Sequence, residues 1–279
     1  MVRLRSARIR STAMARLTDG AMHRFMALAV AVTAVAASPL RAQVMVPDSA
    51  DAPAALAGLR ASALRPGSWT YASTVTRAGA SVELARRTLT IAPAEHEGAA
   101  AWLLLDRTSA RGQVMTDSLL VARDDLRPLR RSAEMGPVRI TLGFRGDSAV
   151  GAMSAPGGDA LRLAVAAGAT PLVANGAMLE AALRLLPLAP GWRGSVSQLA
   201  PTPAGLEVVP VTLAVTAEES VTVPAGTFAA WVVTATSGGV AQRLWVARAG
   251  GVLLRQQASP PHAPDVVFEM VLVEAPPPL

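Results

Sequence analysis

Hydrophobic and polar residues alternate along most of the chain. Between residues 138 and 145, the apolar residues Val138, Ile140, Leu142 and Phe144 occupy every second position. This period of two is typical of a strand with one buried face. Comparable runs recur about every 8–12 residues and are separated by glycine and proline turns. The pattern predicts a mainly β protein, an antiparallel meander that forms a strongly curved sheet or incomplete barrel.

One stretch near the middle of the chain departs from this rhythm. Asn175 is a residue type that caps helices because its side chain accepts a backbone N–H. Apolar residues then follow at helical spacing, and Pro187 ends the run. These apolar residues are Met178, Leu179, Ala182, Leu183 and Leu186. We therefore predict a helix near 175–186 that covers an open face of the sheet.

Residues 219–233 read E-S-V-T-V-P-A-G-T-F-A-A-W-V-V and predict a hairpin. Pro224 suits the first corner of the turn, and Gly226 suits a left-handed position after it. The second strand begins at Phe228 and is apolar on both faces. We therefore expect this strand to be central and covered on both sides, or to face a cavity.

The predicted organisation follows from these elements. We expect strands at 207–216 and 220–223 on the way into this hairpin, and a β-bulge or a sharp bend at 85–87, where the apolar parity of a strand changes. The expected segments are a signal peptide (1–42), an N-terminal tether (43–63), a single β-rich domain (64–274) and a Pro-rich tail (275–279). The domain comprises two meander halves, 64–165 and 188–274, joined by the helix.

The N-terminal segment resembles an export signal. Arginines precede an apolar run, 25–37, that is shorter than the ~20 residues of a membrane span. Cleavage is expected after Ala42 or after Ala36, and an uncleaved N-terminal anchor is the alternative. The chain contains no cysteine, which excludes disulfides and a lipidated cysteine. We therefore expect an exported protein, soluble in the periplasm or outside the cell after cleavage.

The formal charge of +6 lies entirely in that segment, since residues 1–42 hold seven arginines and one aspartate. The rest carries 19 arginines and 19 acidic residues. Nucleic acid is therefore not an expected partner. The densest basic group is Arg123, Arg127, Arg130 and Arg131, interrupted by two aspartates. It could bind an anion, but a solvated turn is the better interpretation.

The hairpin also resembles the signature of a bacterial family of exported β-proteins of unknown function. The residues that carry this resemblance are Val221, Val223, Pro224, Ala225, Gly226 and Phe228. Supporting similarities, in chain order, are Gly67 with Trp69 and Tyr71, the helix followed by Pro190-Gly191, and a closing hairpin at 244–255. The resemblance covers about 64–273. It implies an envelope location and an antiparallel fold similar to the half-barrels of lipoprotein carriers. It implies no catalytic residue.

Catalytic and metal-binding patterns are weak. His96 and His262 are far apart in sequence, and neither has a histidine partner at metal-ligand spacing. The acids Asp106, Asp117, Glu207, Glu218 and Glu219 are candidates by type alone, because no spacing forces two of them together. No G-x-S-x-G or G-x-G-x-x-G sequence is present in a suitable context. We predict no catalytic, cofactor-binding or metal-binding residue and no cofactor.

Aromatic residues provide the one candidate site. Trp69, Tyr71, Trp102, Trp231 and Trp245 all fall on predicted strands. They could line an apolar cleft beneath the helix, or they could simply be core residues. We therefore expect a non-enzymatic envelope protein that binds an apolar small molecule, a lipid or an envelope protein. The alternatives are a structural or interaction module with a fully packed core and, less favoured, an uncharacterised hydrolase.

Overall fold

A computed structural model describes residues 54–166, 172–202 and 205–276. All described residues belong to a single compact unit. The predicted signal peptide and the first part of the predicted tether lie outside the described residues. No helix within the described ranges is long and apolar enough to cross a membrane.

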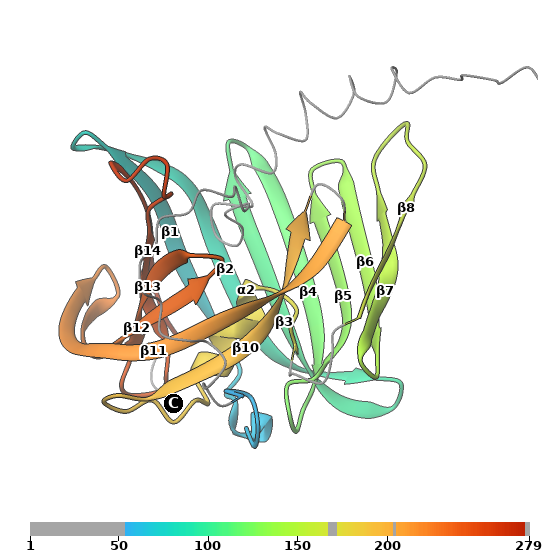
Figure 1. The fold of residues 1–279 in the computed structure, drawn as a ribbon, viewed down its shortest axis with the longest axis horizontal. Coiled ribbons are helices and arrows are strands. Elements are labelled where there is room, and N and C mark those ends of the chain that lie inside the picture. The colour runs from blue at the N-terminus through green and yellow to red at the C-terminus, as the bar shows by residue number, and fades with distance from the viewer. Residues whose placement is uncertain (1–53, 167–171, 203–204, 277–279) are drawn as a thin grey trace, which may run out of the picture. The chain divides into compact units, whose positions relative to one another are not determined.

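All fifteen strands of the described part belong to one sheet (Figure 1). They are β1 (Gly67–Arg77), β2 (Ala80–His96), β3 (Ala99–Ala110), β4 (Gln113–Ala122), β5 (Pro128–Met135), β6 (Val138–Arg145), β7 (Ser148–Ser154), β8 (Leu161–Ala166), β9 (Leu172–Val173), β10 (Arg193–Thr202), β11 (Gly205–Val223), β12 (Gly226–Ser237), β13 (Val240–Ala247), β14 (Leu253–Ala258) and β15 (Val266–Glu274). The sheet order runs from β8 back to β1, then from β15 back to β9. Only the β9–β10 pair is parallel. This confirms the predicted fold class, a mainly antiparallel meander with a single helix.

The sheet curves so that its two ends, β8 on one side and β9 to β11 on the other, approach each other. β8 contacts β11, and a side chain added at Gly205 would lie 3.8 Å from Leu163. A small core fills the space between these ends, with Ile140, Leu142 and Leu163 on one side and Leu172 and Leu199 on the other. The two ends are therefore joined by side-chain packing, which is the incomplete barrel that the sequence predicts.

Helix α2 (Gly176–Leu183) lies inside this curve, against β3 and β9. Asn175 caps it by accepting the backbone N–H of Met178 at 2.9 Å, as predicted. The helix is buried on almost every side, which is typical of a helix without a solvated face. It forms the centre of the main core.

Residues 54–63, the described part of the predicted tether, pack into the same core together with Leu64. Ala55, Leu56, Ala61 and Leu64 are buried, and η3 (Ala61–Ala63) forms a short 3-10 turn there. The indole Nε1 of Trp102 donates to the Ala61 carbonyl at 2.9 Å. The part of this segment that the structure describes therefore belongs to the folded domain.

The strands that we expected at 207–216 and 220–223 form one strand, β11. A register shift between Val215 and Ala217 marks a β-bulge, and the strand continues through it without a turn. A similar shift lies in β2, where Ser73 faces Ala85 and Thr74 faces Glu83. It falls one or two residues before the predicted bulge.

After the register shift between Val215 and Ala217, the β11–β12 hairpin bends back over β14 and β15. β11 contacts β14 and β15 although β12 and β13 lie between them in the sheet. At the hairpin tip, the Ala225 N–H donates to the Leu272 carbonyl at 3.4 Å. Val221 and Val223 are buried, and Gly226 has the predicted positive φ, +137°. β12 is therefore central and covered on both faces, as its apolar pattern indicates.

Candidate functional site

We call the face of the sheet that contacts α2 the inner face. A row of polar residues crosses it on five adjacent strands: Tyr71, Arg87, Asp106, Asp117 and Arg131, here named the polar ladder. Residues directly opposite in an antiparallel pair share a face, as Tyr71 does with Arg87 and Asp106 with Asp117. The ladder therefore places charged groups in the interior of the half-barrel.

Arg87 is the centre of this row. Its Nε donates to Asp106 at 2.7 Å and its Nη2 lies 2.6 Å from the same carboxylate oxygen. Its Nη1 donates to Glu180 of α2 and lies 3.7 Å from the Met270 sulfur. Burial disfavours the charged guanidinium, but the two carboxylates outweigh burial and keep the pKa of Arg87 above its ordinary range. One buried cation thus pairs with two acids and ties the helix to the sheet.

Arg131 makes a second link to the helix segment. Its Nε and Nη2 donate to both oxygens of Asp117 at 2.7–3.2 Å. Its Nη1 donates to the carbonyl of Ala174, one residue before the helix cap, at 3.0 Å. The side chains of Asp106 and Asp117 remain 17% and 23% exposed, so solvent reaches the ladder from one side.

At the other end of α2, Arg184 lies over the ring of Trp69, 3.6 Å from its centroid. Several buried polar atoms along the helix make no hydrogen bond of acceptable geometry. Within the described residues, these atoms are the Tyr71 hydroxyl, Asn175 Nδ2, Glu180 Oε2, and Nε and Nη2 of Arg184. Burial, and then the nearby Glu180 carboxylate, raise the pKa of Tyr71 well above its ordinary range. Burial lowers the pKa of Arg184.

The five aromatic residues predicted from sequence lie in different surroundings. Trp69, Tyr71 and Trp102 are buried on the inner face, in the packed core around α2. Trp231, opposite Val246, is half-buried and lies beneath Arg248, 4.7 Å away. Trp245 is buried on the opposite face.

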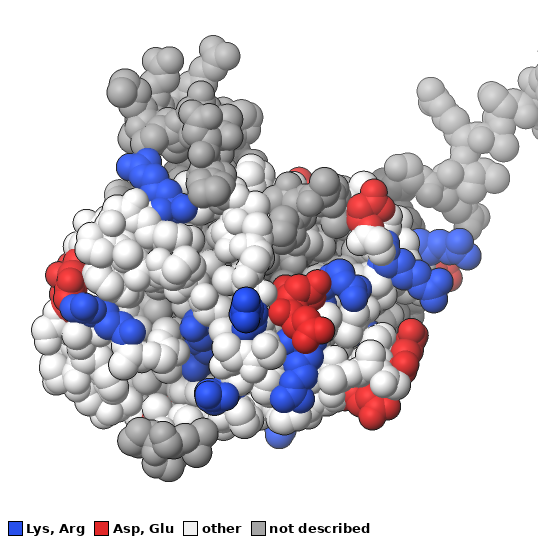
Figure 2. All heavy atoms as spheres, turned by 90° about the horizontal axis from the view of Figure 1, so that it is seen from below, with Lys and Arg blue, Asp and Glu red and all other residues white. Residues whose placement is uncertain are grey.

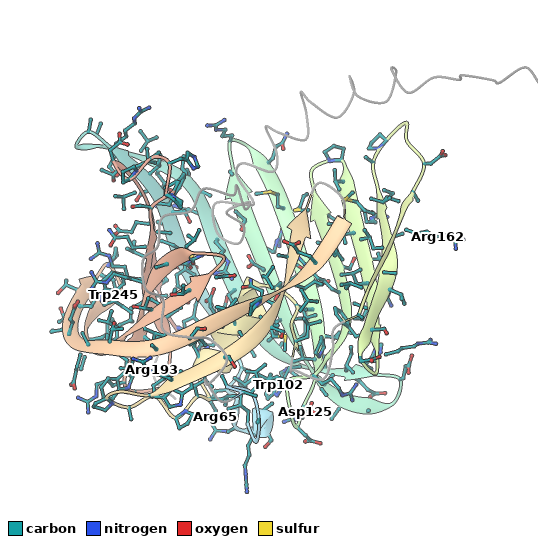
Figure 3. All side chains as sticks on the ribbon, viewed as in Figure 1. Arg65, Trp102, Asp125, Arg162, Arg193 and Trp245 are labelled. Atoms are coloured by element: carbon teal, nitrogen blue, oxygen red, sulfur yellow. The ribbon has the colours of Figure 1, made fainter. Side chains whose placement is uncertain are left out.

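Figure 3 shows Trp102 near the end of the sheet where residues 54–66 lie, and Trp245 among β12–β14. The indole of Trp245 donates to Glu219 at 2.8 Å and lies between Arg243 and Arg255, at 4.7 and 4.9 Å. That the five residues line a common cleft stays a prediction.

Among the acids named from sequence, only Asp106 and Asp117 come together. They are cross-strand partners, a relation that depends on register and has no signal in the sequence. Glu218 and Glu219 instead pair with Arg248 and Arg243. The structure finds no group of three metal-ligating residues in the part of the chain that it describes.

The arginines of the candidate basic group have different partners in the structure. Arg131 turns inward to Asp117, Arg123 lies over Trp102 at 4.8 Å, and Arg127 lies 3.9 Å from Asp125. Figure 2 shows acidic and basic side chains interspersed on the face seen from below. Two surface hollows of about 330 Å³ lie near the shift in β2 and at the β5–β6 turn, away from the aromatic residues.

Three apolar residues of the inner face lie beyond the ladder, toward the C-terminal end of β1. Val75 of β1 is the cross-strand partner of Phe268 in β15. Met115 of β4 is the partner of Thr108 in β3, which is the partner of Arg87 in β2. We name Val75, Met115 and Phe268 the mouth residues. All three are half-buried, and none is among the side chains that form or pack against the two cores. They are the apolar part of the inner face that the described chain leaves partly open.

Together, the fold and the site define a barrel-like β protein with an internal helix and a polar interior row. A model of the family described as "Protein of unknown function (DUF3108)" matches residues 70–261, and the chain belongs to that family. This confirms the resemblance seen in the sequence. No curated protein matches the chain.

Solved structures are similar in fold. A "Beta-barrel-like Protein of Domain of Unknown Function DUF1849" from Brucella abortus is 14% identical, with a TM-score of 0.50, over 78% of this chain and 99% of that chain. The hypothetical lipoprotein YmcC from Escherichia coli is 11% identical, with a TM-score of 0.31, over 78% and 88% of the two chains. These similarities concern architecture only.

Proposed function

We propose that this chain is an exported, non-enzymatic protein of the bacterial envelope that binds an apolar small molecule on its inner face. The partly open mouth residues carry the proposal. Half-exposed apolar side chains on a concave face are typical of small-molecule sites, where a few polar groups fix orientation. Here the polar ladder lies directly beside them. The signal-like segment at 1–42 supports export.

The packed core beneath α2 supports a position at the mouth for the apolar part of the ligand. Met178, Ala181 and Ala182 of α2 are fully buried, as are Leu89 and Leu104 of the sheet. A ligand at the mouth would contact Phe268 and Met115 without displacing these residues. Methionine suits such a surface because it adapts its shape to what it contacts.

An uncharged apolar fluorophore, N-phenylnaphthylamine, tests this site. We expect fluorescence enhancement with the wild-type protein and affinity reduced by about tenfold in Phe268→Ser, because an apolar side chain of this size contributes about 1.5–3 kcal/mol when buried. Val150→Ser is the matched control, since Val150 is 48% exposed and lies on the other face. Equal affinity in all three proteins would place the ligand elsewhere.

The packed core also favours a second candidate, a structural module without a ligand. Native protein extracted with organic solvent separates the two functions. A stoichiometric apolar compound in the mass spectrum supports binding, and its absence, together with no fluorophore enhancement, supports the structural module.

A further inference from the structure

Among the described residues, four of the five buried side-chain polar atoms without a hydrogen bond lie at one place, the contact of α2 with β1. Tyr71 contributes its hydroxyl, Glu180 one oxygen, and Arg184 two nitrogens. Buried polar groups are almost always hydrogen-bonded, so such a concentration indicates a partner of complementary chemistry. Three of these four atoms are donors and only one is an acceptor. A group that completes the cluster must therefore supply mainly acceptors.

The distribution of ion pairs indicates where such a group would bind. Arg87 contacts two carboxylates, those of Asp106 and Glu180. Arg184 makes no ion pair with any described residue; its plane instead stacks on Trp69. Stacking leaves the guanidinium edge free, and Nε and Nη2 are the two nitrogens of one edge. That edge is the one that holds a carboxylate through two parallel hydrogen bonds.

We propose that Arg184 and Tyr71 bind the carboxylate of an amphiphilic ligand whose alkyl chain extends to the mouth residues. Arg184 donates two hydrogen bonds and the Tyr71 hydroxyl a third. Tyr71 keeps its proton, and therefore its donor, throughout the ordinary pH range. Glu180 pairs with Arg87 through Oε1, and its Oε2 makes no hydrogen bond of acceptable geometry with Arg184. This inference rests on the proposed function and names the ligand class.

The dimensions agree with a medium-length chain. Tyr71 and Val75 point to the same face of β1, and four residues of strand span ~13 Å. Met270, opposite Ser73, lies between them on the neighbouring strand. Its flexible side chain can move to admit an alkyl chain. The partly exposed ladder gives solvent access to the same face.

Isothermal titration calorimetry with decanoate and 1-decanol tests the inference. The two probes share a chain and differ in the carboxylate. We expect wild-type protein to bind decanoate at least tenfold more tightly, because charge-assisted bidentate hydrogen bonds are stronger than the neutral hydrogen bonds of an alcohol. Arg184→Met should weaken decanoate about tenfold or more and leave 1-decanol unchanged. Arg248→Met is the control, because Arg248 also stacks on a tryptophan but is exposed and paired with Glu218.

The outcomes are distinct. Equal binding of both probes by the wild-type protein overturns the carboxylate subsite and leaves the apolar site standing. Binding of neither probe overturns both proposals. If Arg184→Met fails to fold, the wild-type comparison alone decides, and Tyr71→Phe supplies a second variant, for which a selective loss of decanoate affinity is expected.

Discussion

Tyr71 should keep its proton far into the alkaline range, and this can be measured directly because it is the only tyrosine of the chain. Its hydroxyl is fully buried, and a tyrosinate there would lose its hydration and lie close to the Glu180 carboxylate. Both effects favour the neutral phenol and raise its pKa. The chain contains no lysine or cysteine, so few other groups titrate in this range.

The effect on stability follows from proton linkage. In the unfolded chain Tyr71 ionises near pH ~10, whereas in the folded protein it stays protonated. Above pH ~10 the folded state therefore binds more protons than the unfolded state, and the free energy of unfolding falls by ~1.4 kcal/mol per pH unit. The stabilisation is complete below that pH, and at pH ~11.5 about 2 kcal/mol of it is lost.

The assay follows tyrosinate absorbance and tryptophan fluorescence together as the pH is raised. We expect both signals to change together, because Tyr71 ionises only when the domain unfolds. Tyr71→Phe should abolish the slope of stability between pH ~10 and ~11.5. A reversible tyrosinate transition near pH ~10, with tryptophan fluorescence unchanged, would refute the reasoning and show that the hydroxyl is hydrated.

Two further predictions concern the attachment of α2, and urea unfolding followed by tryptophan fluorescence measures both. Arg87→Met should lower the free energy of unfolding by about 3–5 kcal/mol, because it leaves two acids unpaired. Glu180→Met should lower it by less than half as much, because Arg87 keeps its ion pair with Asp106. Equal decreases would contradict this assignment. Gly251→Ala should destabilise the protein more than Gly250→Ala. Both glycines have a positive φ, which strains an alanine by about 1–3 kcal/mol. Only at Gly251 would the added Cβ also lie 2.4 Å from the Cα of Arg184. Equal losses would show that the turn moves away from the helix.

The sequence predicts the architecture well because local rules determine it. Alternation predicts the strands, glycine and proline predict the turns, and Asn175 predicts the helix start. The one merged strand, β11, shows where such rules fail. A bulge and a turn both change the apolar parity, and the difference between them depends on whether the partner strand continues. That partner, β12, is identified only by the fold.

The polar interior could not be predicted in this way. Asp106 and Asp117 are eleven residues apart in sequence, and their contact depends on the register of a hairpin. Arg87 and Glu180 are brought together by the docking of a helix that lies some ninety residues later in the chain. Glu180 even looks like a solvated helix position, because charged residues are rarely fully buried unless they are paired.

The composition of the inner face bears on what the domain does. An apolar replacement of a buried ion pair is often neutral or stabilising, so stability alone does not account for the Arg87–Glu180 contact. The same helix carries the unpartnered edge of Arg184, and an adjacent strand carries the unpartnered Tyr71 hydroxyl. A module selected only to pack would not need these donors in its core. The proposed ligand would give them a partner, and it would also account for the mouth residues, which no part of the described chain covers completely.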